Sequence, residues 1–146
     1  MSFDVNHIRS QRVIAGAGID GDTAKDGSLA VVGTRAIGAD YPTVTLTDAN
    51  ADVILGALTD EYQEDLVPFG SSGVTDSDFV SVVDKGVVAF RTNTAYVAAN
   101  FGAAVRPDAN AARNGWVEFN AAATQFRCVG GYSVGGAHYL LVDLDK

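Results

Sequence analysis

Short apolar runs separated by glycine-containing turns dominate the second half of this 146-residue chain. The run at 78–83 is followed by a turn at Gly86 and a returning run at 87–91, and Gly135-Gly136 separates the last two runs. A Gly-Gly pair between apolar strands suits a hairpin turn that needs positive φ at both central residues. Strands that recur at intervals of about 8 to 12 residues are typical of a β-barrel or β-sandwich. The pattern therefore predicts an all-β fold, and we expect a small β-barrel.

The expected strands lie at residues 28–37, 41–46, 52–58, 78–83, 87–91, 94–98, 102–106, 116–119, 126–132 and 137–144. One segment is ambiguous, because Thr47 or Asp48 could cap a short helix. We favour a turn at 47–51 followed by the strand at 52–58. An acidic loop or a short helical turn is expected at 59–65.

Composition suits one folded domain and limits its partners. The chain is 47% hydrophobic and 19% charged, which argues against global disorder. Its formal net charge is −8. An acidic surface repels phosphate backbones and anionic lipids, so we expect neither a nucleic-acid partner nor a membrane partner. The N-terminal sequence predicts no secretory signal, and no apolar run approaches the length of a transmembrane helix. We expect a soluble protein made in a reducing compartment.

The first fifteen residues differ from the rest. Phe3, Val5 and Ile8 are spaced as an extended segment would space them. We therefore expect residues 1–15 to form an N-terminal arm or an edge strand, and residues 16–146 to form a single barrel domain.

Glycines and aspartates between residues 16 and 28 resemble two ligand-binding motifs. Gly16–Gly21 matches GxGxxG, but no helix follows to face a pyrophosphate, so a β-turn is favoured. Asp20, Asp22 and Asp26 suggest calcium, yet positions 5 and 12 of an EF-hand loop that starts at Asp20 fall on Ala24 and Val31. Adventitious cation binding in this turn stays open. We predict no cofactor and no resident metal.

Two other groups of residues are candidates for catalytic sites. Glu61, Glu64 and Asp65 have the pattern of a solvated loop rather than of a tuned acid–base pair. Cys128 and His138 would form a nucleophile–base pair if they faced each other across the Gly135-Gly136 hairpin. A cysteine within an apolar strand, however, is usually a buried small hydrophobe. We predict no catalytic residues.

Trp116 and Phe119 have opposite parity on one strand, so they point to opposite faces of the sheet. This favours one of them in the core and the other at an interface.

A resemblance to a known family rests on several short segments. They are Asp52–Glu61, Val82–Val88, Asn100–Asp108, Val129–Ser133 and Ala137–Leu144. In this order they resemble the small capsid decoration, or cement, proteins of tailed bacteriophages. The Gly102–Pro107 segment matches a G-x-x-V-x-P pattern, and the last strand ends in Val-x-Leu. The resemblance covers residues 28–144.

The resemblance implies a barrel or β-tulip-like fold and a homotrimer on the outer surface of the virion capsid. The partner would be the major capsid protein, and the chain would be made in the host cytoplasm. An N-terminal arm could add a strand to a neighbour. The interface residues we expect are Phe3, Val5, His7, Ile8, Arg9, Arg12 and Trp116.

Two other functions stay open. One is a different virion module, such as a tail, spike or carbohydrate-binding domain, with contacts at Trp116, Tyr132 and Tyr139. The other is an enzyme that uses Cys128, His138 or the acidic loop.

Overall fold

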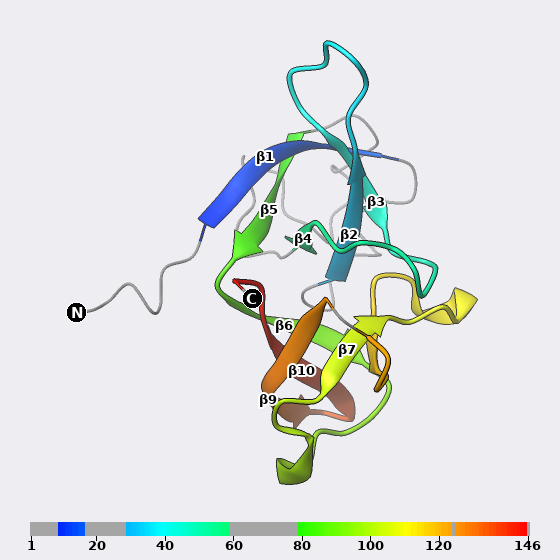
Figure 1. Cartoon of the computed structure of the whole chain (residues 1–146), viewed down its shortest axis with the longest axis vertical. Helices are drawn as coiled ribbons and strands as arrows, with labels where there is room; N and C mark the ends of the chain where they lie inside the picture. Colours follow the sequence, from blue (N-terminus) through cyan, green and yellow to red (C-terminus); the bar gives the residue numbers. More distant parts are fainter. Residues whose placement is uncertain (1–8, 17–28, 59–78, 124, 146) are drawn as a thin grey trace, which may run out of the picture.

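The computed structural model describes residues 9–16, 29–58, 79–123 and 125–145. These residues are almost entirely β-structure, which confirms the all-β prediction. They form two closed barrels of five strands each, stacked along the long axis of the molecule (Figure 1). The strands are β1 (Arg9–Ala15), β2 (Leu29–Thr34), β3 (Thr43–Leu46), β4 (Gly56–Leu58), β5 (Phe79–Lys85), β6 (Val87–Thr92), β7 (Ala104–Pro107), β8 (Val117–Phe119), β9 (Phe126–Val134) and β10 (Ala137–Asp143).

The N-terminal barrel contains β1 to β5 in the order β1-β3-β2-β4-β5. β1 closes it, because β1 pairs parallel with β3 and antiparallel with β5. Alternate residues point inward, as the period of a strand requires. The buried core contains Val13, Ala15, Val31, Val44, Leu58 and Val82.

The predicted arm is described only in part. Residues 1–8 lie outside the described ranges. Residues 9–15 are β1, which has a hydrogen-bonded neighbour on each side. These seven residues are therefore a strand of a closed barrel, paired with β5 along most of their length and with β3 at Ile14 and Ala15.

The C-terminal barrel contains β6 to β10 in the order β10-β6-β8-β7-β9. β9 and β10 form a hairpin whose turn is Gly135-Gly136, with φ of 57° and 85°. This confirms the predicted turn, since both residues adopt the left-handed region. The sequence predicts one barrel over 16–146, whereas the described residues close into two.

Two predicted elements differ in the structure. The strand expected at 52–58 is reduced to β4, while the preceding turn is present, with Asp52 Oδ2 accepting hydrogen bonds from the backbone of Asp48 and Ala49. The strand expected at 94–98 is absent from this described segment. Instead a 3₁₀ turn, η3 (Ala98–Asn100), forms there. Asn100 Oδ1 accepts a hydrogen bond from Val97 N at 3.0 Å, and this local bond competes with strand pairing.

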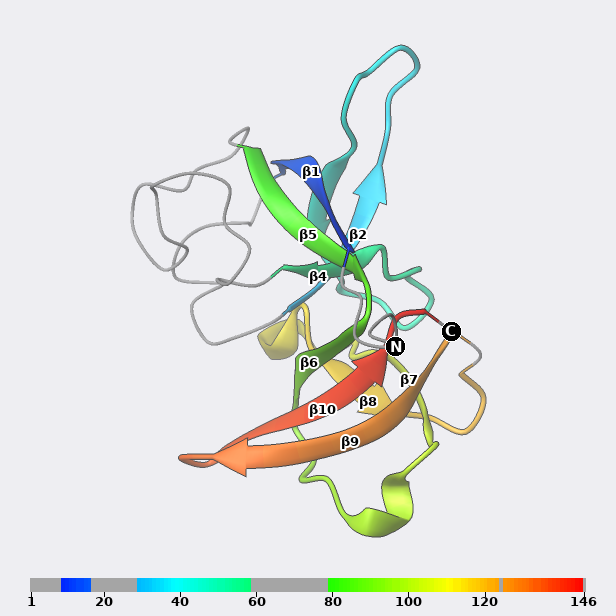
Figure 2. The same cartoon turned by 90° about the vertical axis from the view of Figure 1, so that its left-hand side faces the viewer.

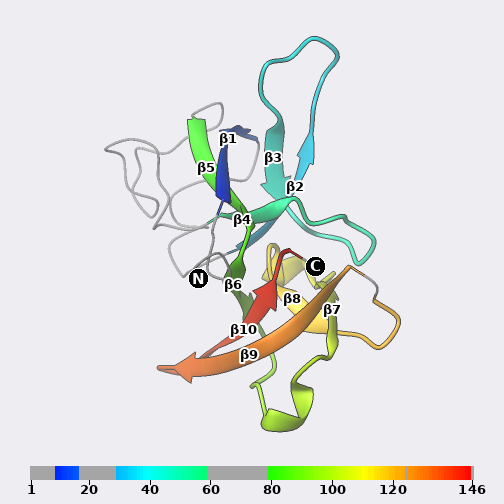
Figure 3. The same cartoon turned by 60° about the vertical axis from the view of Figure 1, so that its left-hand side comes forward.

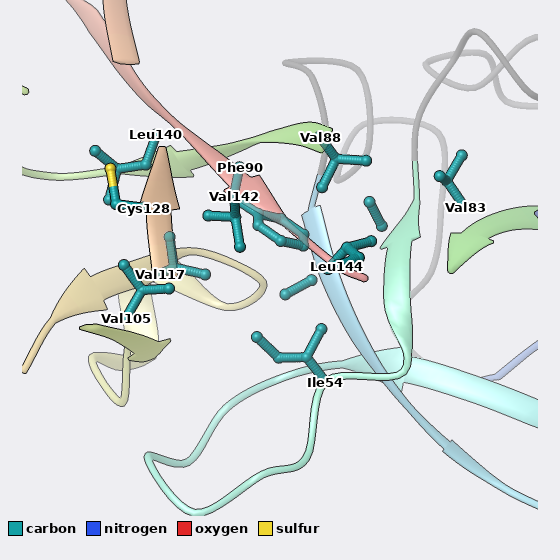
Figure 4. Packing of buried hydrophobic residues seen from close by; sticks show 12 residues of the cluster. Ile54, Val83, Val88, Phe90, Val105, Val117, Cys128, Leu140, Val142 and Leu144 are labelled. Carbon is teal, nitrogen blue, oxygen red and sulfur yellow. The ribbon is translucent and has the colours of Figure 1, made fainter. Parts of the chain in front are cut away.

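The two barrels share one hydrophobic core. Its buried members include Ala30, Ile54, Ala57 and Val83 from the N-terminal barrel. They pack with residues of the C-terminal half of the chain, namely Val88, Phe90, Val105, Val117, Cys128, Leu140, Val142 and Leu144. Figure 4 shows Ile54, Leu144 and Val88 lying between Val83 and the interior of the C-terminal barrel. The core of the C-terminal barrel is thus completed by residues of the N-terminal barrel, which also has the separate interior cluster described above.

Gly115 joins the two barrels through its main chain. Gly115 N donates to Thr47 O at 2.8 Å, and Gly115 O accepts from Ala30 N at 2.7 Å. A Cβ at this position would lie 3.0 Å from Leu29 Cβ, and the φ of Gly115 is +83°. Glycine is required here by close approach and by backbone conformation together.

A buried ion pair holds the loop that carries Gly115. Asp108 is only 3% exposed, and its Oδ2 accepts from Arg113 Nε at 2.8 Å. Its Oδ1 accepts from Asn110 N at 2.8 Å, and its own backbone N donates to Trp116 O at 2.9 Å. Asp108 therefore holds the loop through its carboxylate and its backbone N–H together, which presents Gly115 to the N-terminal barrel.

We predict that Gly115→Ala lowers the free energy of unfolding by about 2–4 kcal/mol, from strained φ and crowding against Leu29. Gly38→Ala is the matched control, because Gly38 has a φ of +82° and open space around its missing Cβ. Gly38→Ala should lower the free energy of unfolding only through its strained φ, by about 1–2 kcal/mol. Urea unfolding of the two variants measures the difference. Equal losses of unfolding free energy in the two variants would contradict the role of Gly115 in joining the two barrels.

Candidate functional site

Four side chains from four neighbouring strands form a row on the outer face of the C-terminal barrel. Tyr132 lies on β9, Tyr139 on β10 and Arg91 on β6, while Trp116 directly precedes β8. The register pairs Tyr132 with Tyr139 and Tyr139 with Arg91. Thr92 pairs with Val117, which puts Arg91 beside Trp116. We call these four residues the aromatic row.

The row is held by ring contacts. Tyr132 and Tyr139 stack with ring centroids 5.0 Å apart and planes 21° apart. The Arg91 guanidinium carbon lies 4.5 Å from the centre of the Trp116 ring and 5.7 Å from that of Tyr139. Each cation–π contact of this kind contributes about 0.5–2 kcal/mol. The row thus reaches continuously across the barrel surface from β8 to β9.

The alternation of the strands explains why these four side chains face outward. Their sequence neighbours Phe90, Val117 and Leu140 are fully buried in the shared core. Because side chains alternate between faces, Arg91, Trp116 and Tyr139 must lie on the other side of the sheet. Phe119 packs against the core, so the predicted opposite facing of Trp116 and Phe119 is confirmed, while an interface at Trp116 stays a prediction.

A cleft of about 380 Å³ lies where the two barrels meet, a boundary we call the seam. Residues 50–53 of the N-terminal barrel face β7 across this cleft. Gln125 lines this cleft and forms two hydrogen bonds with the main chain of Ile54. Its Oε1 accepts from Ile54 N at 3.2 Å, and its Nε2 donates to Ile54 O at 3.3 Å.

Glu118 organises the polar side chains beside the same cleft. Its Oε2 accepts from Arg106 Nε at 2.8 Å and from Asn50 Nδ2 at 3.2 Å. Asn50 Nδ2 also donates to Pro107 O at 2.8 Å. The two Asn50 bonds connect one barrel to the other, whereas the Arg106–Glu118 bond lies within the C-terminal barrel.

The nucleophile–base pair considered for Cys128 and His138 does not form. Cys128 pairs with Val142, whereas His138 pairs with Ser133. Cys128 is fully buried, and burial raises the pKa of its thiol, against a smaller opposing effect of its hydrogen bond to Gly130 O. The protonated thiol is a weak nucleophile.

His138 contacts a serine instead. The distance between Ser133 Oγ and His138 Nδ1 is 2.7 Å, on an exposed part of the hairpin. Sequence reasoning missed this contact, because it depends on the register of the hairpin.

The predicted interface residues are scattered over the chain. Trp116 is half-buried in the aromatic row, and Arg12 is exposed on β1. Arg9 begins β1 and pairs with Lys85. The remaining four lie outside the described residues, namely Phe3, Val5, His7 and Ile8.

Of the other candidate motifs, the structure describes only Gly16, the first residue of the GxGxxG motif. Gly16 follows β1, and its backbone N donates to Val44 O at 2.8 Å. The remainder of the GxGxxG motif, the aspartates at 20, 22 and 26, and the acidic loop all lie outside the described ranges. Within those ranges, no group of three or more His, Cys, Asp or Glu residues is placed to hold a metal ion. None of the described helices is long and apolar enough to cross a bilayer.

Comparison with known proteins gives no relative: no family model, no curated protein and no solved structure matches the chain.

We predict that Arg91→Ala exposes the ring of Trp116 and shifts its fluorescence emission to longer wavelength. Trp116 is the only tryptophan in the chain, so the emission reports on this ring alone. The free energy of unfolding should fall by about 0.5–2 kcal/mol. Arg127→Ala is the control, because Arg127 is exposed on β9 outside the row. An unchanged spectrum for Arg91→Ala would show that Arg91 does not cover Trp116.

Proposed function

We propose that the chain is a capsid decoration protein, a structural virion component that binds the outer surface of a phage head and links neighbouring major capsid subunits. The observation that carries this proposal is the placement of exposed apolar side chains at both ends of an elongated body. The resemblance over residues 28–144 supports the same assignment.

One end of the body is the loop between β2 and β3, residues 35–42. In Figures 1, 2 and 3 this loop projects beyond the N-terminal barrel. Ile37 lies in it with its side chain fully exposed, at 107%. The loop is braced from within, because Arg35 Nη2 donates to Asp40 O at 2.8 Å and Ala39 N donates to Ala36 O at 3.1 Å.

The opposite end is the loop that contains η3, which projects from the C-terminal barrel at the bottom of Figure 1. Val97 and Phe101 flank η3 with exposures of 56% and 69%. Burial of one such side chain against a partner contributes about 1.5–3 kcal/mol. The shared core fixes the two ends relative to each other, so a body of this shape can bridge two subunits.

A bridge of this kind stabilises a shell by binding its assembled state preferentially. A net charge of −8 suits the outside of a shell, away from the packaged genome. The proposal includes a homotrimer, as the resemblance implies. It also includes contacts by the N-terminal residues Phe3, Val5, His7 and Ile8.

We predict that Ile37→Asp and Phe101→Asp each weaken co-sedimentation with expanded heads about tenfold or more. The heads to use are those of a major capsid protein whose gene adjoins the gene of this chain, if the genome carries one. Ala121→Asp is the control, since it adds the same charge at an exposed alanine away from both ends. Light scattering should show a trimer in solution. A stable monomer that fails to sediment with heads would refute the proposed function.

A carbohydrate-binding virion module is the second candidate, and the aromatic row favours it. Tyr132 is 45% exposed, and an exposed aromatic ring can stack on a sugar. This function predicts glycan-array binding that disappears with Trp116→Ala, with Arg127→Ala as the control. Arg91 already occupies one face of Trp116, so we expect no glycan signal from the unmodified chain. A signal that depends on Trp116 would establish this function over the first.

A further inference from the structure

The β9 strand extends past its partner on one side. It pairs with β10 from Arg127 to Val134, but its register with β7 covers only Phe126 and Arg127. The Cys128 main chain still bonds Gly102 and Ala103. Beyond it, no strand among the described residues pairs with β9 on the side away from β10. Figures 2 and 3 show this end of the hairpin projecting from the barrel.

The geometry of the hairpin identifies the backbone groups along this open edge. In a hairpin with a two-residue turn, Val134 and Ala137 exchange hydrogen bonds, and bonded pairs then alternate along the ladder. Tyr132 and Tyr139 are therefore a bonded pair. The N–H and C=O groups of Gly131 and Ser133 point outward, to the open edge.

The η3 segment contacts β9, and Tyr96 packs on Gly131, but the sequence of this edge lacks two features that usually prevent edge pairing. Natural proteins protect such strands with charged residues, especially lysine, or with proline. Residues 129–134 contain neither. From 119 to 142, Arg127 is the only charged residue among Asp, Glu, Lys and Arg, in a chain of net charge −8. Charge repulsion between two acidic copies is thus small along this stretch.

We propose that the β9 edge binds the β9 edge of a second copy of this chain, antiparallel about a twofold axis. The outward groups define the register. Gly131 of each copy bonds Ser133 of the other, which places Tyr132 opposite Tyr132 of the second copy. Such a non-bonded pair brings side chains closest together across an antiparallel ladder. The exposed Tyr132 ring then packs on its equivalent, and the aromatic row continues into the second copy.

This contact is separate from the proposed attachment to capsids. It is an isologous twofold interface, so it joins copies in pairs whether or not trimers also form. One strand pair buries much less than the roughly 1,600 Å² of a standard interface. We expect a weak dimer, with a Kd on the order of 10 µM to 1 mM.

A matched pair of variants at Ser133 tests the backbone bonds. Ser133→Pro removes an outward N–H without removing a β9–β10 ladder bond, and should weaken dimerisation about tenfold or more by sedimentation equilibrium. Ser133→Ala keeps the N–H and should dimerise as the unmodified chain does. Far-ultraviolet circular dichroism checks that both variants are folded. Equal association of the two variants would overturn the proposal.

A charge-swap experiment at Tyr132 tests the register and does not depend on proline. Tyr132→Lys or Tyr132→Glu places like charges directly opposite each other, which destabilises a cross-strand pair. Each variant alone should be defective in dimerisation, and an equimolar mixture should recover it as a heterodimer. Failure of the mixture to recover association, or undiminished association of either variant alone, would overturn the proposal.

Discussion

The core shared between the two barrels is the constraint on which the rest of the structure depends. Barrels this small have little interior to bury, and small folding units are correspondingly marginal. Here Ile54 and Val83 complete the core of the C-terminal half, and Gly115 inserts its main chain between β2 and the turn after β3. Each barrel is thus stabilised by the other, and the pair acts as one elongated body.

The functional features depend on the fixed arrangement of the two barrels. The loops at the two ends present Ile37 and Phe101 in fixed relative positions, as a bridge between subunits requires. The aromatic row and the open β9 edge lie on the C-terminal barrel, where alternation directs aromatic side chains outward. In the cleft between the barrels, Asn50 and Gln125 form hydrogen bonds from one barrel to the other, so these polar groups have a structural role.

Local patterns allowed much of the fold to be predicted. The hairpin turn at Gly135-Gly136 and the opposite facing of Trp116 and Phe119 depend only on neighbouring residues, and both were predicted correctly. Strand partners depend on contacts between distant residues, which periodicity does not encode. The parallel pairing of β1 with β3, and with it the closure of a separate N-terminal barrel, was therefore not predicted. The aromatic row was missed for the same reason, although each of its members was visible in the sequence.

Cooperativity of unfolding tests the shared core most directly. Trp116 fluorescence reports on the C-terminal barrel, and amide hydrogen exchange at Val31 and Val44 reports on the N-terminal barrel. With increasing urea, both signals should change in one transition with the same midpoint. Loss of protection at Val31 and Val44 at a urea concentration that leaves Trp116 emission unchanged would contradict the shared core.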